Sequence, residues 1–211
     1  MLIRVLTSFC AFSAVTKPLS LLRMSSSGIG SGASGINVDG TLKKFATPQP
    51  STAAAVAAAT GDTTHLASSP WQDLLVADDC GNTPLVWCAD KGQHDALKLI
   101  LEVVERENPS TVNNRGYLGN TALARAARGG HLQCVISLLS ASQINPNIAN
   151  EKLQYPLHFA AFKKHPAIVE ALLSSKLCDT MVLDRKGRTP AEDTSDAAIR
   201  AMIVESRGKS V

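Results

Sequence analysis

Residues 83–101 read TPLVWCADKGQHDALKLIL, and the same arrangement returns as TALARAARGGHLQCVISLL at 121–139 and YPLHFAAFKKHPAIVEALL at 155–173. A shortened fourth copy starts with Thr-Pro at 189–190. The copies begin 38, 34 and 34 residues apart. Self-similarity at a period of this size indicates a repeat protein, in which each unit buries its apolar face only by stacking on its neighbours.

Each full copy predicts two helices joined by a polar turn. Thr83 can cap the first helix, and Pro84 suits its first turn because the missing N–H would have no helical partner there. Small residues such as Ala126 and Ala127 let the two helices approach closely, and a second apolar helix follows. The first copy is four residues longer, close to one helical turn, so we predict a longer second helix there.

These stretches resemble the ankyrin repeat, since they follow its T-P-L-H-x-A-A-x-x-G-H pattern without a gap. The preceding turns agree, with Gly81, Gly119 and Gly187 two residues before the copy, Asp78, Asn150 and Asp184 five before it, and Asn113 and Asn147 eight before it. The resemblance covers residues 71–205. It implies an all-α solenoid with β-turn fingers, three full repeats and a shortened capping repeat, and residues 71–77 could close the other end.

The third copy departs from the family pattern at three positions. Leu153 replaces the turn glycine, Tyr155 replaces Thr, and Lys164 replaces Gly. Because glycine normally supplies a positive φ in such a turn, we expect Leu153 to be strained or the turn to be of another type.

Outside the repeats the chain carries little large apolar surface. Residues 1–23 are basic, apolar and free of acidic side chains, so they suit a targeting segment, unless Met24 is the working start. Residues 24–70 are mostly Ser, Gly, Ala, Thr and Pro, which predicts a disordered linker, and a disordered tail is expected at 206–211. The glycine pattern at 30–35 lacks the strand and helix that a dinucleotide site needs.

Charge and hydropathy narrow the function. The whole net charge of +3 comes from residues 1–70, and the rest balances 16 basic against 16 acidic residues, so nucleic-acid binding is disfavoured. The longest apolar stretch, residues 5–15, is too short to cross a bilayer. We expect an intracellular, cytoplasmic monomer, with organelle import or secretory entry as the alternative if residues 1–23 target the chain.

No motif for catalysis, metal or cofactor is present, so we expect a protein that is not an enzyme and has no cofactor. His131, His158 and His165 fall on positions of the family pattern where imidazoles make structural hydrogen bonds. Cys88 and Cys134 are expected to be buried, whereas Cys80 in a finger is the cysteine expected to react.

The resemblance implies that a partner protein is held by the fingers and by the ends of the first helices. Exposed aromatic residues and arginines dominate interface energetics, and Tyr117 and Phe162 beside Arg128 would form an anchor on a concave face. The candidate partner-binding residues are Arg115, Tyr117, Leu118, Asn120, Arg128, Lys152, Phe162, Lys163, Arg185 and Arg188.

The leading hypothesis is therefore a non-catalytic protein-protein interaction module that presents a concave binding face to an unidentified partner. The alternative is binding of a polyanion, either nucleic acid or anionic lipid, through Arg185, Lys186, Arg188 and the basic N-terminal segment. A third hypothesis is redox sensing through Cys80.

Overall fold

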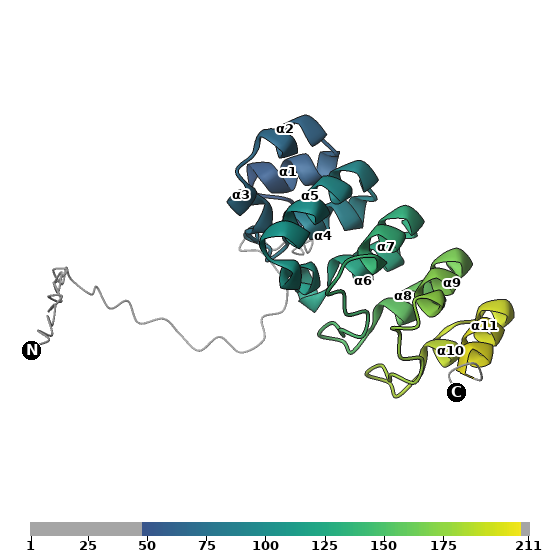
Figure 1. The fold of residues 1–211 in the computed structure, drawn as a ribbon. Coiled ribbons are helices and arrows are strands. Elements are labelled where there is room, and N and C mark those ends of the chain that lie inside the picture. Colours follow the sequence, from purple (N-terminus) through teal and green to yellow (C-terminus); the bar gives the residue numbers. More distant parts are fainter. Residues whose placement is uncertain (1–47, 208–211) are drawn as a thin grey trace, which may run out of the picture. The chain divides into compact units, whose positions relative to one another are not determined.

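The computed structural model describes residues 48–207, and every regular element in that range is a helix (Figure 1). The α-helices are α1 Ala53–Thr60, α2 Thr63–Ser68, α3 Trp71–Leu75, α4 Pro84–Lys91, α5 His94–Glu107, α6 Ala122–Gly129, α7 Leu132–Leu139, α8 Pro156–Phe162, α9 Pro166–Ser174, α10 Pro190–Asp193 and α11 Ala197–Arg207. Two short 3₁₀ turns, η1 Pro109–Asn113 and η2 Tyr117–Gly119, lie between α5 and α6.

The helices stack in two parallel rows. The first helices α1, α4, α6, α8 and α10 each contact the next in one row, and the second helices α2, α5, α7, α9 and α11 do the same in the other (Figure 1). Leu97, Leu138 and Leu172 on the second row are fully buried between the rows. This arrangement confirms the all-α ankyrin-type solenoid.

The repeat pattern sets the helix ends. The hydroxyl oxygens of Thr83 and Thr121 accept hydrogen bonds from Val86 N and Ala124 N at 3.4 and 3.3 Å, which caps α4 and α6. Gly92 and Gly130 end these helices with φ of 71° and 83°, a conformation that a side chain disfavours.

The prediction of a disordered linker over 24–70 is wrong for its C-terminal part, because residues 53–68 form α1 and α2. Ala54, Ala55, Ala57 and Ala58 are buried, and Cys88 Sγ donates to the Ala58 carbonyl at 3.4 Å. Alanine is the best helix former, and its small side chain lets α1 lie close against α4. Residues 24–47 lie outside the described residues.

The described residues therefore contain five stacked helix pairs, one more than the three repeats and cap predicted from the sequence. The first pair, α1 and α2, stands where residues 71–77 were expected to close the stack. Helix α3 lies within that segment and contacts α4 and α5, but Trp71 at its start is exposed.

Two expectations about helix length are confirmed. Helix α5 has 14 residues, against 8 in α7 and 9 in α9, so the longer spacing lengthens a helix rather than a loop. Helix α10 has only 4 residues, in keeping with a shortened last repeat. Helix α11 continues to Arg207, so the predicted tail from 206 starts two residues too early, and residues 208–211 lie outside the described range.

Of the two alternatives expected for Leu153, a strained residue or a turn of another type, the structure shows the first: Leu153 adopts a positive φ of 56°, and Lys164 has a φ of 59°. An L residue with a Cβ is strained in this region by about 1–2 kcal/mol. Both residues are exposed, so little packing offsets that cost.

Consecutive repeats are also joined by polar side chains. Asn113 donates to Gln143 O and accepts from Asn145 N, while Asn147 donates to Leu177 O and accepts from Asp179 N, at 2.7 to 2.9 Å. Both asparagines therefore tie their own repeat to the following one. Within residues 48–207, no helix is long and apolar enough to cross a membrane.

Candidate functional site

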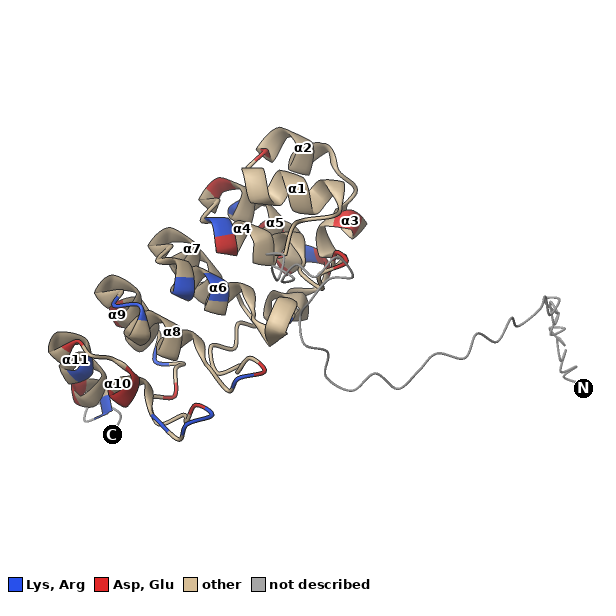
Figure 2. Cartoon of the chain, turned by 180° about the vertical axis from the view of Figure 1, so that it is seen from behind, with Lys and Arg blue, Asp and Glu red and all other residues tan. Residues whose placement is uncertain are grey.

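One side of the stack, here called the finger face, is formed by the finger turns 76–83, 114–121, 148–155 and 182–189 together with the C-terminal ends of α4, α6 and α8. All four fingers share the same backbone bonds, for example Asp78 N to Asn82 O at 2.9 Å and Gly81 N to Asp78 O at 2.8 Å. Figure 2 shows Lys and Arg recurring along the finger loops near α8 and α10, interspersed with carboxylates.

The first hollow of this face, the Tyr117 pocket, has a volume of about 510 Å³. It joins three consecutive repeats, since side chains from α4, from the finger before α6, from α6 and from the end of α8 line it. Its lining consists of Pro48, Gln49, Trp87, Asp90, Lys91, Tyr117, Leu118, Arg125, Arg128, Gly129 and Lys163. Tyr117 and Leu118, which are 37% and 38% exposed, give the pocket an accessible apolar wall.

Arg125 is the buried charge of the Tyr117 pocket, with a side chain only 9% exposed. Its Nη1 donates to Asp90 Oδ1 at 3.2 Å and its Nη2 to the Tyr117 carbonyl at 3.3 Å. Its Nε has no hydrogen-bond partner among the described residues. A buried guanidinium whose donors are partly unused is costly, so this group favours an additional acceptor.

Leu118 holds a left-handed conformation with φ of 60°, directly before Gly119 at 72°. Two bonds from neighbouring fingers fix this turn: Glu151 N donates to the Leu118 carbonyl at 3.2 Å, and Tyr117 N donates to Asn82 Oδ1 at 2.8 Å. Strain of this kind persists only where the surroundings enforce it, and it is frequent at functional sites.

The second hollow, the Phe162 pocket, has a volume of about 260 Å³ and lies between the last two fingers. Its lining residues are Lys152, Gln154, Phe162, Asp184, Arg185, Lys186, Arg188 and Asp193. Phe162 is 57% exposed, and Lys163 Nζ lies 5.9 Å from the centre of its ring. The pocket therefore offers an accessible ring with cations around it.

Arg188 forms ion pairs with two carboxylates of the protein itself. Its Nη2 lies 2.9 Å from Asp184 Oδ2 and 2.6 Å from Asp193 Oδ1. Burial opposes ionisation of Asp184, but the N–H groups of Arg188 and Lys186 and the Arg188 guanidinium outweigh it and lower the pKa of that carboxyl. Arg185 also donates to the Glu151 carbonyl, at 3.3 Å.

The structure sorts the ten predicted partner-binding residues into four groups. Tyr117, Leu118, Arg128 and Lys163 line the Tyr117 pocket, whereas Lys152, Phe162, Arg185 and Arg188 line the Phe162 pocket. Arg115 is exposed but lines neither pocket, and Asn120 is buried.

One prediction about this set needs correction. Asn120 is only 3% exposed, and its amide donates to the Tyr117 carbonyl and accepts from Asn150 Nδ2, so it joins neighbouring fingers. Tyr117 and Phe162 line neighbouring pockets, and Arg128 lines the pocket of Tyr117.

The sequence reasoning missed Arg125 and the segment Pro48–Gln49, although both line the Tyr117 pocket. The sequence does contain an indication that Arg125 is unusual, because the same position of the first and third copies holds the large apolar residues Trp87 and Phe159. An arginine there, within an alanine-rich helix, is a charge in a position that is otherwise part of the core.

Two of the three pattern histidines, His131 and His158, make the structural hydrogen bonds expected of them. The fully buried His158 lies 3.0 Å through Nε2 from the Arg188 carbonyl, and His131 Nε2 lies 3.3 Å from the Asp90 carbonyl. The ring of His131 lies so close to Gly92 that a Cβ there would come within 2.4 Å of it, and His165 lies in the same way against Gly130, at 2.9 Å.

Cys88 and Cys134 are buried, as expected. Burial raises the pKa of the Cys88 thiol far above its usual range and raises the pKa of the Cys134 thiol to about 11. Cys80 is partly exposed, and its Sγ lies 3.6 Å from the Gln49 carbonyl. Among residues 48–207, no group of three or more His, Cys, Asp or Glu side chains could hold a metal ion.

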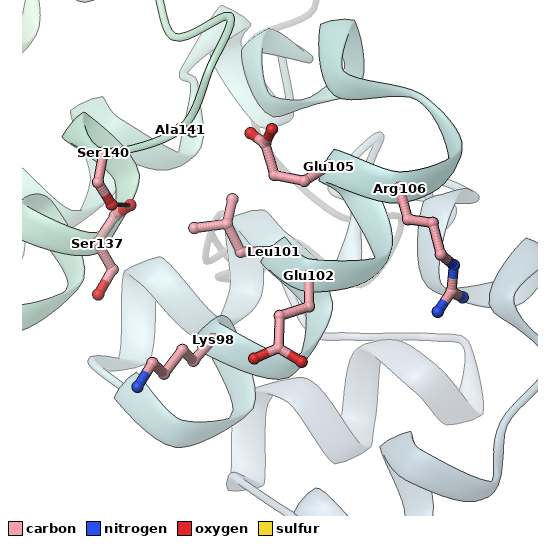
Figure 3. Close-up of a pocket in the computed structure, with 8 residues that line it drawn as sticks. All are labelled: Lys98, Leu101, Glu102, Glu105, Arg106, Ser137, Ser140 and Ala141. Carbon is pink, nitrogen blue, oxygen red and sulfur yellow. Dashed lines mark hydrogen bonds between the residues drawn. The ribbon is translucent and has the colours of Figure 1, made fainter.

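A further hollow of about 530 Å³ lies on the second row and is lined by residues of α5 and by residues at the C-terminal end of α7 (Figure 3). Leu101 points into it, and Glu105 closes one edge by accepting from the Ser142 N–H and hydroxyl at 3.0 and 2.6 Å. Lys98 and Arg106 are matched there by Glu102 and Glu105, so the hollow favours neither anions nor cations.

Comparison with family models places the repeats. A model described as "Ankyrin repeats (3 copies)" matches residues 53–150, and one described as "Ankyrin repeat" matches residues 153–185. The first match begins at α1, in agreement with the additional helix pair.

Curated relatives match over part of this chain. E3 ubiquitin-protein ligase XBAT33 of Arabidopsis thaliana is 36% identical over 97 residues, which is 46% of this chain and 18% of the relative. Ankyrin repeat-containing protein ITN1 of Arabidopsis thaliana is 46% identical over 65 residues, or 30% of this chain and 11% of the relative. Probable E3 ubiquitin-protein ligase XBOS32 of Oryza sativa subsp. japonica is 32% identical over 98 residues, which is 44% of this chain and 18% of the relative. The match spans less than a quarter of each of these relatives.

Proposed function

This chain belongs to the ankyrin repeat family, and from that membership we propose that it is a non-catalytic module that binds another protein through its finger face. Ankyrin repeats generally serve as protein-protein interaction modules. The proposal adds to that general role a particular surface on this chain, the finger face with its two pockets.

The observation that carries the proposal is the pair of hollows at which consecutive repeats meet. Eight of the ten residues expected to bind a partner line one or the other. Exposed Tyr117, Leu118 and Phe162 supply apolar contact area there, surrounded by cationic side chains. Because stacked repeats hold these side chains on a rigid frame, little ordering entropy would be lost on binding.

The relatives give no reason to assign a catalytic activity to this chain. Two of them are named as ubiquitin ligases, but the match covers only 18% of their length. We therefore leave the ligase activity with the relatives and base the proposed binding role on the ankyrin repeats.

The experiment compares proteins recovered with the full-length chain and with a Tyr117→Ala/Phe162→Ala variant. Each truncation should cost about 1–2 kcal/mol of binding, so the double variant should lose the partners that the unmodified chain retains. Because both rings are exposed, the melting temperature and the circular dichroism spectrum should stay near those of the unmodified chain.

The matched control is Ile136→Ala/Val204→Ala, which removes two exposed apolar side chains from the second row, on α7 and α11. It should leave partner recovery unchanged. The proposal would be refuted if the Tyr117→Ala/Phe162→Ala variant still recovered the partners and the control variant did not. Binding would then be assigned to the second row.

A further inference from the structure

The Tyr117 pocket contains an excess of positive charge that the protein does not balance. Four of its lining side chains are cationic, Lys91, Arg125, Arg128 and Lys163, and one is acidic, Asp90. Asp90 already accepts from Arg125 at 3.2 Å and lies 3.7 Å from Lys91. Arg128 and Lys163 have no carboxylate partner among the described residues, so the pocket has spare capacity for an anion.

Arg125 distinguishes this positive charge from that of an ordinary solvated surface, because its side chain is buried. Only two of the five N–H donors of its guanidinium are used, both in bonds longer than 3.1 Å, although the side chain is nine-tenths buried. A carboxylate entering the pocket would offset the desolvation of this charge and would be held by charge-assisted hydrogen bonds.

The chain's own N-terminal segment is a poor occupant. Pro48 and Gln49, the first residues that the structure describes, form part of the pocket wall. However, residues 1–47 contain five Lys or Arg and a single Asp, so their charge has the same sign as that of the pocket. Charge complementarity therefore points to another molecule.

The apolar wall of the Tyr117 pocket indicates which kind of anionic molecule fits it. Tyr117 and Leu118 are exposed beside the cations, and a nucleic-acid backbone gains little from such a wall, whereas a peptide side chain can bury against it. We propose, on the basis of the function proposed above, that the Tyr117 pocket binds a segment of the partner in which an Asp or Glu adjoins a large apolar residue. The carboxylate pairs with Arg125, Arg128 and Lys163, and the apolar side chain lies on Tyr117 and Leu118.

The test pans a random dodecapeptide library against the full-length chain and measures the affinity of the selected peptides. Selected peptides should be rich in Asp or Glu next to Leu, Ile, Phe, Tyr or Trp. Replacing that Glu by Gln in the peptide should weaken binding by about tenfold, and addition of the Glu peptide should shift the NMR signal of the Arg125 Nε–H.

Two protein variants locate the binding. The Arg128→Gln/Lys163→Gln variant should bind the Glu peptide about tenfold more weakly. The control variant Lys98→Gln/Arg106→Gln, which removes two cations from the second row, should bind it with unchanged affinity. Equal binding of the Gln peptide, enrichment of peptides without acidic residues, or tighter binding of a DNA duplex than of the peptides would overturn the proposal.

The two proposals can fail separately. If Tyr117→Ala/Phe162→Ala abolishes partner recovery but no acidic peptide is selected, the finger face binds proteins and the inference about the Tyr117 pocket is wrong. If partner recovery is unaffected by that change, the proposed function fails, and the peptide experiment alone decides what the pocket binds.

Discussion

At Leu118 a strained backbone and an exposed apolar side chain coincide at the wall of a candidate pocket. Leu118→Gly should relieve the left-handed conformation and raise the free energy of unfolding by about 1 kcal/mol, because glycine adopts it without penalty. The same change removes apolar contact area and should weaken partner binding. Urea unfolding and a binding titration measure the two effects, which should have opposite signs.

Leu153 supplies the matched control, since it is equally left-handed and exposed but lines neither finger-face pocket. Leu153→Gly should stabilise by a similar amount without changing partner affinity, and Leu153→Ala, which keeps a Cβ, should not stabilise. A destabilisation of more than about 1 kcal/mol by Leu153→Gly would mean that this side chain packs or meets a partner.

Cysteine labelling should follow burial. At pH 8, iodoacetamide should modify Cys80 first among the four described cysteines, because thiolates react and burial raises the pKa of the Cys134 and Cys178 thiols to about 11. Cys88 should react only when the chain unfolds. Peptide-resolved mass spectrometry gives the order, and labelling of Cys88 before Cys80 in the folded protein would contradict it.

Among the elements, α1 offers the sharpest test, because it was expected to be disordered. Ala58→Glu would place an unpaired carboxylate at a fully buried position against α4 and should lower the unfolding free energy by about 2–4 kcal/mol. Val56→Glu introduces the same carboxylate two residues away at an exposed position. It should change the unfolding free energy by less than about 0.5 kcal/mol. Equal effects in thermal and urea unfolding would show that α1 does not pack as described.

Helices α4 to α9 could be predicted from the sequence because their signals are local. Thr83 and Thr121 cap their own helices, Gly92 and Gly130 end them, and the apolar spacing between these points has a helical period. The length of α5 could be predicted too, since a four-residue insertion in helical pattern continues to the Asn108–Pro109 stop.

What could not be predicted depends on contacts between distant residues. The alanines of α1 pack only because α4 lies against them, and nothing in their own composition reveals that neighbour. Arg125 bonds to partners 8 and 35 residues away, and Asn120 bonds to the next finger, so the burial of neither residue could be predicted from its position in the sequence.

For the molecule as a whole, the charge distribution predicts weak binding of polyanions. Residues 71–211 carry equal numbers of basic and acidic side chains, and Arg188 is paired with Asp184 and Asp193. A fluorescent 20-base-pair DNA duplex should therefore bind the full-length chain weakly at about 150 mM salt. Tight binding that falls about 10³-fold or more between 50 and 200 mM salt would instead reveal many phosphate contacts and favour the polyanion hypothesis.

The contact between a turn glycine and the histidine of the following repeat restricts the order in which the units can be joined. His131 and His165 lie where a Cβ on Gly92 or Gly130 would collide with the ring, so a unit that begins its second helix after a histidine fits without rearrangement behind a unit that ends its first helix with glycine. The unit containing α8 and α9 has Lys164 at that position. A tandem duplication of this unit would set the new copy of His165 against Lys164, whereas the unit containing α6 and α7 could be duplicated without such a clash. If the array has grown by copying, the unit containing α6 and α7 is the better template, because copying the unit containing α8 and α9 would force His165 or Lys164 to move.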